Sequence, residues 1–201
     1  WMMSLDPAWY STMYGISFMV ACGLSALAFA IVVLAILAKE SPMREIADPM
    51  HFRDLGNLTL AFVMLWAYTA FSQFMLIWYG NIREETPYYV TRAFGQWGIL
   101  AVVLVVFHFF LPFFFLLIRA MKDRPATIAI VAVLLLVMRA VDLHWLIAPS
   151  FHEKAFHVHW LDVTAILGLF GIWLFVFLVN LRKQPYLPLE SPLAKEAMSH
   201  A

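Results

Sequence analysis

Five long apolar stretches, separated by short polar segments, run along the chain. An apolar stretch of about 18 residues with few charges is long enough to cross a bilayer as a helix. Irregular backbone cannot face lipid, so such stretches pack as helical bundles. The pattern therefore predicts an all-α, polytopic transmembrane bundle over residues 1–183, with helices at 15–38, 55–82, 93–118, 126–148 and 163–181, followed by a tail at 184–201.

Prolines mark the connections between these stretches. Asp48-Pro49 breaks the chain after the first helix, and Asp123 and Pro125 predict a sharp turn before the fourth. Pro112 lies inside the third stretch and lacks the N–H that would bond the carbonyl of His108, which predicts a kink there. Because the connections are short, consecutive helices are expected to be antiparallel neighbours.

Composition excludes several classes of protein. The 201 residues are 64% apolar and only 13% charged, whereas soluble domains are about 45–50% apolar and about 25% charged. The formal net charge is zero, which argues against a nucleic-acid partner because phosphate binding needs clustered cations. The single cysteine, Cys22, excludes a disulfide framework, a cysteine-ligated zinc site and an iron–sulfur cluster held by this chain alone.

Lysines and arginines are distributed unequally between the two sets of loops. Cytoplasmic loops carry the excess of these residues, and aromatic residues gather at membrane interfaces. We therefore expect a multi-pass protein of the bacterial inner membrane, with residue 1 outside and the C-terminus in the cytoplasm. The cytoplasmic set has nine members: Lys39, Arg44, Arg53, Arg119, Lys122, Arg124, Arg182, Lys183 and Lys195. The outer set has three, Arg83, Arg92 and Lys154, beside a predicted interfacial belt of Trp1, Trp9, Tyr10, Trp78, Tyr79, Tyr88, Tyr89, Trp97, Trp145 and Trp160.

Two charged residues lie inside the fourth apolar stretch. Arg139 and Asp142 are three positions apart, so they share a helix face and can pair. Intramembrane charges are costly and usually functional. The pair is interpreted either as a proton relay or gate facing the bundle interior, or as a structural ion pair that fixes packing within the chain or against another subunit.

His108 is the single ionisable residue of the third apolar stretch. With a carbonyl freed by Pro112, its imidazole could bind a quinone head group, a water or a proton; the alternative is a core histidine hydrogen-bonded to a neighbouring helix. Gln73 is the other candidate for contact with a quinone. Haem b is not favoured, because His108 and His144 differ in expected depth by about 10 Å.

Titratable residues are concentrated at the outer ends of the helices. Histidine titrates near physiological pH, so this surface is interpreted as a partner-docking or proton-releasing region. His157 and His159 alone define no metal site, because a third ligand is missing. Asp162 could instead cap the last helix. The residues are Glu84, Glu85, His144, His152, Glu153, His157, His159 and Asp162.

Two segments resemble one known family of membrane subunits. Residues 1–15 (WMMSLDPAWYSTMYG) and 71–85 (FSQFMLIWYGNIREE) look like segments of the ActF-type subunits of alternative complex III. The stretch from His108 to Pro112 and the prolines Pro185 and Pro188 fit the same pattern. The family's Asn-Leu-Pro-Glu-Glu or Asn-Ile-Pro-Glu-Glu motif has Arg83 in place of proline here, which adds a charge at the helix exit.

The resemblance implies a ten-helix, NrfD/PsrC-like subunit of which this chain would be the second half, and that would explain its first residue, Trp1. It also implies a respiratory or photosynthetic complex that oxidises quinol. This chain would bind no cofactor itself. The haem c groups, the iron–sulfur clusters and the better quinol site would belong to partner subunits: haem c subunits, an iron–sulfur subunit and an ActC-like sister.

Two functions are carried forward from the sequence. In the first, a quinol:electron acceptor oxidoreductase complex contains this chain as a scaffold and proton conductor. Its relay would be Arg139 and Asp142, with His108 as a waypoint and Glu84, Glu85 and Asp162 as the outer exit. The alternative is a secondary transporter or channel whose charged pair lines a substrate path, and a haem b anchor ranks below both.

Overall fold

The computed structural model describes residues 2–7, 9–40, 43–152, 156 and 159–183. All regular structure in this part of the chain is helical, and five helices are long and apolar enough to cross a membrane. The predicted all-α bundle with five spans is therefore confirmed. The elements are η1 (Met3–Leu5), α1 (Thr12–Leu37), α2 (Met43–Ile46), α3 (Pro49–Gly80), α4 (Thr86–Ala93), α5 (Gly95–Leu104), η2 (Val105–Phe110), α6 (Leu111–Leu117), α7 (Arg119–Lys122), α8 (Pro125–Ile147), η3 (Ala148–Ser150) and α9 (Trp160–Lys183).

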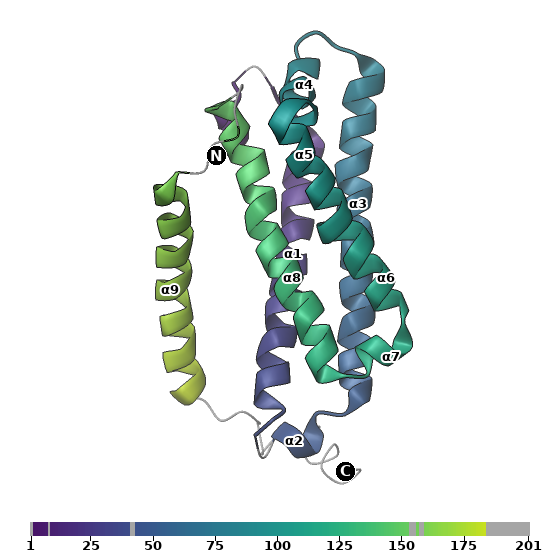
Figure 1. Cartoon of the computed structure of the whole chain (residues 1–201), viewed down its shortest axis with the longest axis vertical. Coiled ribbons are helices and arrows are strands. Elements are labelled where there is room, and N and C mark those ends of the chain that lie inside the picture. Colours follow the sequence, from purple (N-terminus) through teal and green to yellow (C-terminus); the bar gives the residue numbers. More distant parts are fainter. Residues whose placement is uncertain (1, 8, 41–42, 153–155, 157–158, 184–201) are drawn as a thin grey trace. The chain divides into compact units, whose positions relative to one another are not determined.

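The chain divides into two compact units. The first, residues 1–37 and 47–156, contains four long helical stretches: α1, α3, the continuous run α5–η2–α6, and α8. In this unit α1 packs against both α3 and α8, and η2 and α6 pack against α3 and α8 (Figure 1). The second unit contains α2 and the 24-residue span α9, none of whose residues is buried.

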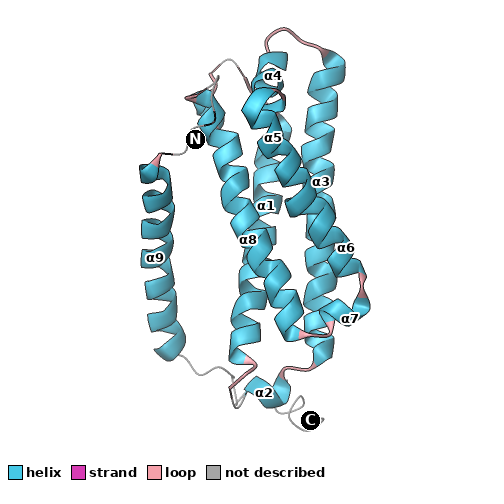
Figure 2. Cartoon of the chain, in the orientation of Figure 1, coloured by secondary structure: helices cyan, strands magenta, loops and turns pink. Residues whose placement is uncertain are grey.

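Short connections link antiparallel neighbours within the first unit (Figure 2). One end of this bundle carries α4, η3 and the segment before α1, and we call it the α4 end. The opposite end carries α7, and we call it the α7 end.

The second span begins earlier than its hydrophobic stretch. Asp48 lies before the first turn of α3, and its Oδ1 accepts a hydrogen bond from the N–H of Met50 at 2.9 Å. Pro49 occupies the first helical position, where a missing N–H costs nothing. The helix therefore starts at Pro49 and includes polar residues that the apolar pattern left out of 55–82. It ends at Gly80, and the next residue, Asn81, adopts a left-handed conformation with φ of 47°.

Pro112 is accommodated without a break in the third span. The backbone widens into a π-helix over Val105–Phe110, where the N–H of Leu111 donates to the carbonyl of Val106. A π turn shifts the hydrogen-bonding register by one residue, and such turns occur often at functional sites. The disturbance expected from Pro112 thus takes the form of a wider turn immediately before it, and that turn contains His108.

Candidate functional site

Arg139 and Asp142 form a buried ion pair in the first unit. Both project from α8, and Nη1 of Arg139 donates to Oδ2 of Asp142. Arg139 is 8% exposed and Asp142 is 4% exposed, so the pair is enclosed rather than lipid-facing. The Arg139 guanidinium also lies over the ring of Phe18 on α1, with Cζ 5.0 Å from the ring centroid. The ion pair predicted from the three-residue spacing is therefore present, and its side chains point toward the other helices of the bundle.

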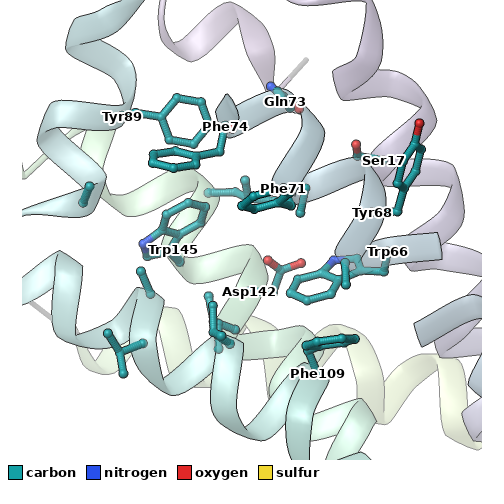
Figure 3. A pocket seen from close by; sticks show the side chains of 18 of the residues that line it. Ser17, Trp66, Tyr68, Phe71, Gln73, Phe74, Tyr89, Phe109, Asp142 and Trp145 are labelled. Carbon is teal, nitrogen blue, oxygen red and sulfur yellow. The ribbon is translucent and has the colours of Figure 1, made fainter. Parts of the chain in front are cut away.

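A cavity of about 870 Å³ adjoins this pair. Ligand pockets have volumes of roughly 300–1,000 Å³ and mostly apolar walls with a few polar groups. Side chains from α1, α3, α4, α5, η2 and α8 line it, with aromatic rings gathered around the Asp142 carboxylate (Figure 3). We call it the central cavity, and its aromatic lining residues are Tyr14, Phe18, Trp66, Tyr68, Phe71, Phe74, Tyr88, Tyr89, Phe109, Phe110 and Trp145.

Gln73 provides a second polar group on the wall of the central cavity. It projects from α3, is 6% exposed, and its amide makes no hydrogen bond with any residue that the structure describes. The Oγ of Ser17 and the Nε1 of Trp145 are fully buried on this wall and have no hydrogen-bond partner. A buried polar group without a partner costs about 1–3 kcal/mol, so this cavity wall has hydrogen-bonding capacity that the protein itself does not use.

A smaller cavity of about 260 Å³ extends toward the α4 end of the bundle. Gln73 lines both cavities, and Glu85 lines the smaller one together with Tyr10 and Ser11. The two cavities therefore place Asp142, Gln73 and Glu85 in sequence from the interior to the end of the bundle. This arrangement joins two residues that the sequence proposed separately as relay and exit.

His108 lies in the core beside the central cavity, but its side chain does not line that cavity. It is 1% exposed, and its ring centroid lies 4.3 Å from that of Trp66, which does line the cavity. Neither ring nitrogen completes a hydrogen bond, although the Met138 carbonyl is close enough to interact with the imidazole. His108 therefore packs against Trp66, which lines the cavity, and does not line the cavity itself.

The other residues predicted to lie on the outer side are not gathered into this site. Glu84 is exposed in the loop after α3 and lines neither cavity. His144 packs against Trp97, with ring centroids 5.8 Å apart. His152 is exposed, while Glu153 and His157 lie outside the described residues. No group of three or more metal-ligating side chains occurs among the residues for which placements are given.

Asp162 has a local role at the start of α9. Its Oδ2 accepts a hydrogen bond from the backbone N–H of His159 at 2.9 Å, and Nδ1 of His159 accepts from the N–H of Leu161 at 3.3 Å. Two side chains that reciprocally satisfy N–H groups form a capping box. The contacts of Asp162 are therefore those of a residue that caps the start of α9.

Arg92 is an interaction centre that sequence reasoning missed. Its position between two apolar stretches predicts an outer loop charge, but it is 2% exposed at the end of α4. Its Nη2 donates to Oδ2 of Asp6 at 3.0 Å, to the carbonyl of Leu146 at 3.1 Å and to Oγ of Ser150 at 3.0 Å. Its Cζ lies 3.6 Å from the ring centroid of Tyr88. We call this set of contacts the Arg92 clamp.

Several residues predicted for an interfacial aromatic belt are buried instead. Trp9, Tyr88, Tyr89 and Trp97 are each less than 10% exposed, and Trp9 stacks on Tyr88 with ring centroids 3.7 Å apart. Trp9, Tyr88 and Tyr89 pack together where the segment before α1 meets the short helix α4, and Trp97 on α5 packs against His144 and Phe156. Tyr10, Trp78, Tyr79 and Trp160 are exposed, as a belt requires, and Trp1 lies outside the described residues.

Burial also sets the proton affinity of the two tyrosines. It raises the pKa of both Tyr88 and Tyr89 far above the ordinary tyrosine value of 10.0, and the nearby charge of Arg92 offsets this only in part. Both phenols line the central cavity and stay protonated at physiological pH. They can act there as neutral hydrogen-bonding groups and not as bases.

No protein-family model matches the chain, and a search of the curated proteins found no match. The candidate site is therefore defined by its geometry. It consists of a buried ion pair on α8, a large aromatic cavity beside that pair, and Gln73 between this cavity and a smaller one that reaches Glu85.

Proposed function

We propose that this chain is an integral membrane subunit of a quinol-oxidising complex similar to alternative complex III, in which it scaffolds other subunits and conducts protons. The observation that carries the proposal is the placement of Asp142, Gln73 and Glu85 along two adjoining cavities. The resemblance of residues 1–15 and 71–85 to ActF-type subunits supports the type of complex, and Gln73 and Glu85 both lie in the second segment.

The chemistry of the three residues suits proton transfer. A carboxylate can take up and release a proton, and Asp142 has one oxygen bound to Arg139 while no described residue donates to the other. The amide of Gln73 can donate and accept hydrogen bonds but cannot be charged near neutral pH. Water in the cavities would then connect Asp142 to Glu85, with Gln73 orienting it. Arg139 donates a hydrogen bond to one oxygen of Asp142 and so fixes the position of its carboxylate.

In this proposal, electron transfer takes place in neighbouring subunits. An ActC-like sister subunit would bind quinol, and iron–sulfur and haem c subunits would carry the electrons. The exposed apolar surface of the five spans would contact lipid and these partners.

Purification of the chain from its native membrane tests the assembly. We expect a tagged full-length chain, extracted in mild detergent, to elute with subunits that give the absorption bands of haem c and iron–sulfur clusters. Elution of this chain as an isolated homo-oligomer, with no redox absorption, would contradict the proposal.

Substitution of the buried carboxylate tests proton conduction. In the assembled complex reconstituted into vesicles, Asp142→Asn keeps the size of the side chain and removes its titration. We expect proton release to fall by roughly tenfold or more, because a positioned acid–base group contributes at least that much. Asp54→Asn, an exposed carboxylate near the α7 end, is the control. Unchanged quinol oxidation and proton release in Asp142→Asn would restrict the pair to a structural role.

A secondary transporter or channel is the second candidate, and the π turn favours it. Transporters bind their substrates at interruptions in membrane helices, and Val105, Phe109 and Phe110 of η2 line the central cavity. This candidate requires the chain to be active without redox subunits. The purification described above therefore separates the two functions.

A further inference from the structure

Lys122 at the α7 end is a buried cation without a carboxylate partner. The residue is 7% exposed, and its stem packs so closely on α3 that a Cβ added at Gly56 would lie 2.9 Å from its Cγ and Cδ. Its Nζ donates to Oδ1 of Asn57 at 2.6 Å, and no described carboxylate lies within ion-pair distance of it. A lysine ammonium has three donors, and a buried charge is costly unless it is paired. The described part of the chain therefore leaves this charge and two of its donors unmatched.

Two arginines next to Lys122 in the sequence add further positive charge. The side chain of Arg119 is 73% exposed, and its Nε lies 3.9 Å from Oδ2 of Asp123, a carboxylate that Arg53 already binds at 2.7 Å. Arg124 is exposed, and its side chain makes no hydrogen bond or ion pair with any residue that the structure describes. Both arginines therefore have donors available to an anion from outside the chain.

The acidic residues near this end are associated mainly with Arg53. Its direct partner is Asp123, and the other carboxylates that interact electrostatically with it are Asp48 and Asp54. Arg119 and Lys122 also lie close enough to Asp123 to lower its pKa. They share that single carboxylate with Arg53, so an excess of positive charge remains on the side of α7 away from this ion pair.

The α7 segment lies where two membrane spans end. One candidate span ends at Leu117 and the next begins at Pro125, so residues 118–124 connect the two at the membrane surface (Figure 1). Phe114, Leu117 and Ile118, which precede α7, are 58%, 52% and 49% exposed. Anionic lipids attract basic residues beside membrane spans, and basic pockets there bind lipid head groups. A phospholipid would contact these apolar residues with its acyl chains and the cations with its phosphate.

We propose that the α7 end binds the phosphate group of an anionic phospholipid such as phosphatidylglycerol, with Arg119, Lys122 and Arg124 as its ligands. The phosphate oxygens accept hydrogen bonds from the ammonium and guanidinium groups, and the acyl chains lie beside Phe114 and Leu117. Guanidinium groups match phosphate oxygens in geometry as well as in charge. The site rests on the α7 end alone, so it is independent of both functions considered above.

A fluorescent label on α7 reports lipid contact in the full chain, within the assembly in which it purifies. In a chain with Cys22→Ser, Ala120→Cys places a thiol at an exposed position of α7 for labelling with bimane. The sample is placed in phosphatidylcholine nanodiscs that contain a minor fraction of phosphatidylglycerol or phosphatidylcholine with a nitroxide near the top of one acyl chain. The signal of the Cys22→Ser chain without the new cysteine is subtracted.

We expect the nitroxide-labelled phosphatidylglycerol to quench bimane at a lower mole fraction than the labelled phosphatidylcholine. The difference should be about fivefold to twentyfold, because each basic residue near an anionic lipid contributes about fivefold in affinity. We call this difference the lipid preference.

Charge-removing variants with a matched control locate the site. Arg119→Gln combined with Arg124→Gln is expected to remove most of the lipid preference, and both positions are exposed, so the fold does not depend on them. Arg83→Gln removes an exposed arginine at the α4 end and is expected to leave the preference unchanged. Lys122→Met keeps the stem beside Gly56 and removes the ammonium, which should lower the preference about fivefold.

Three results would overturn the proposal. The first is equal quenching by the two labelled lipids in the chain that retains all three cations. The second is an undiminished lipid preference in the double arginine variant, which decides the matter if Lys122→Met does not fold. The third is loss of the preference on addition of millimolar inorganic phosphate at constant ionic strength, which would show that the site takes a soluble phosphate instead of a lipid. A preference that survives phosphate and disappears with the two arginines supports the phospholipid site.

Discussion

Arg92 brings a charge into the protein interior and connects three separate parts of the chain. Its guanidinium contacts Asp6 before α1, the carbonyl of Leu146 on α8 and the hydroxyl of Ser150 in η3. Ser150 Oγ also donates to Oδ2 of Asp6 at 2.9 Å, so Asp6 accepts from both. The Arg92 clamp lies beside Tyr88, which lines the central cavity. The clamp therefore holds the wall of the candidate site at the α4 end.

Replacement of Arg92 tests this role. Hydrogen bonds to charged groups contribute about 1.5–3 kcal/mol each, so Arg92→Met is expected to lower the free energy of unfolding by ~3 kcal/mol. Thermal unfolding of the detergent-solubilised protein measures the effect as a drop of several degrees. Arg83→Met is the matched control, because Arg83 is exposed in the neighbouring loop. Equal melting temperatures for the two variants would show that the clamp does not stabilise the fold.

Gly98 shows how the junction between two helices restricts the sequence. It lies in the first turn of α5, and a Cβ added there would be 2.4 Å from the carbonyl oxygen of Ala93 at the end of α4. Backbone atoms cannot move aside as a flexible side chain can. Gly95, in the same turn, has φ of 64°, a left-handed conformation that favours glycine. The sharp passage from α4 into α5 therefore depends on both glycines.

An alanine at position 98 is expected to destabilise this junction. Overpacking costs about 1–3 kcal/mol, so Gly98→Ala should lower the melting temperature by several degrees. Gly15→Ala is the control, because no heavy atom lies within 4 Å of an added Cβ at that position. There alanine should be neutral or stabilise α1, since it is the better helix former by about 1 kcal/mol. A neutral Gly98→Ala would contradict the tight junction.

The α7 end is tied by an ion pair whose strength depends on pH. Nε of Arg53 on α3 donates to Oδ1 of Asp123 at 2.7 Å, and this hydrogen bond holds the pKa of Asp123 below its ordinary value of 3.8. A lowered pKa in the folded state means that the stabilisation is fully present above about pH 4. It is lost as the pH falls through the lower pKa of the folded protein.

Melting temperatures at two pH values test this link. At pH 6 we expect Asp123→Asn to melt below the unmodified protein, by a small margin because the pair is partly exposed. The margin should shrink toward zero as the pH approaches 2–3, because protonation removes the same contact in the unmodified chain. Asp54→Asn, at an exposed position of α3, should show no such convergence. A margin that stays constant with pH would argue against the pair.

At the scale of the whole molecule, the distribution of Lys and Arg predicts which end faces the cytoplasm. Glu84 is exposed at the α4 end and Arg124 is exposed at the α7 end. In a chain with Cys22→Ser, a membrane-impermeant maleimide added to intact cells with a permeable outer envelope should label Glu84→Cys and not Arg124→Cys. Labelling of Arg124→Cys alone would reverse the proposed orientation and place Glu85 on the cytoplasmic side.

Much of the architecture could be predicted from the sequence. The length and apolarity of five stretches determined five spans, because the bilayer accepts only segments that satisfy their own backbone hydrogen bonds. Local signals also predicted the turn before Pro125, the disturbance near Pro112 and the pairing of Arg139 with Asp142, whereas Asp48-Pro49 was predicted as a chain break and is the start of α3. Each of these depends on residues within a few positions of one another.

The site itself was decided by the tertiary structure. Arg92 and Trp9 are predicted to lie at the surface, but both are buried. Their positions in the sequence do not reveal that their segments fold back over the bundle. Gln73 and Asp142 line the same cavity only because α3 and α8 pack in one bundle. The membrane-spanning segments could be predicted because they depend on short-range hydrophobicity and on hydrogen bonds within each helix. Only the packing of distant helices decided which polar groups share a cavity, because that depends on side-chain shape across the bundle.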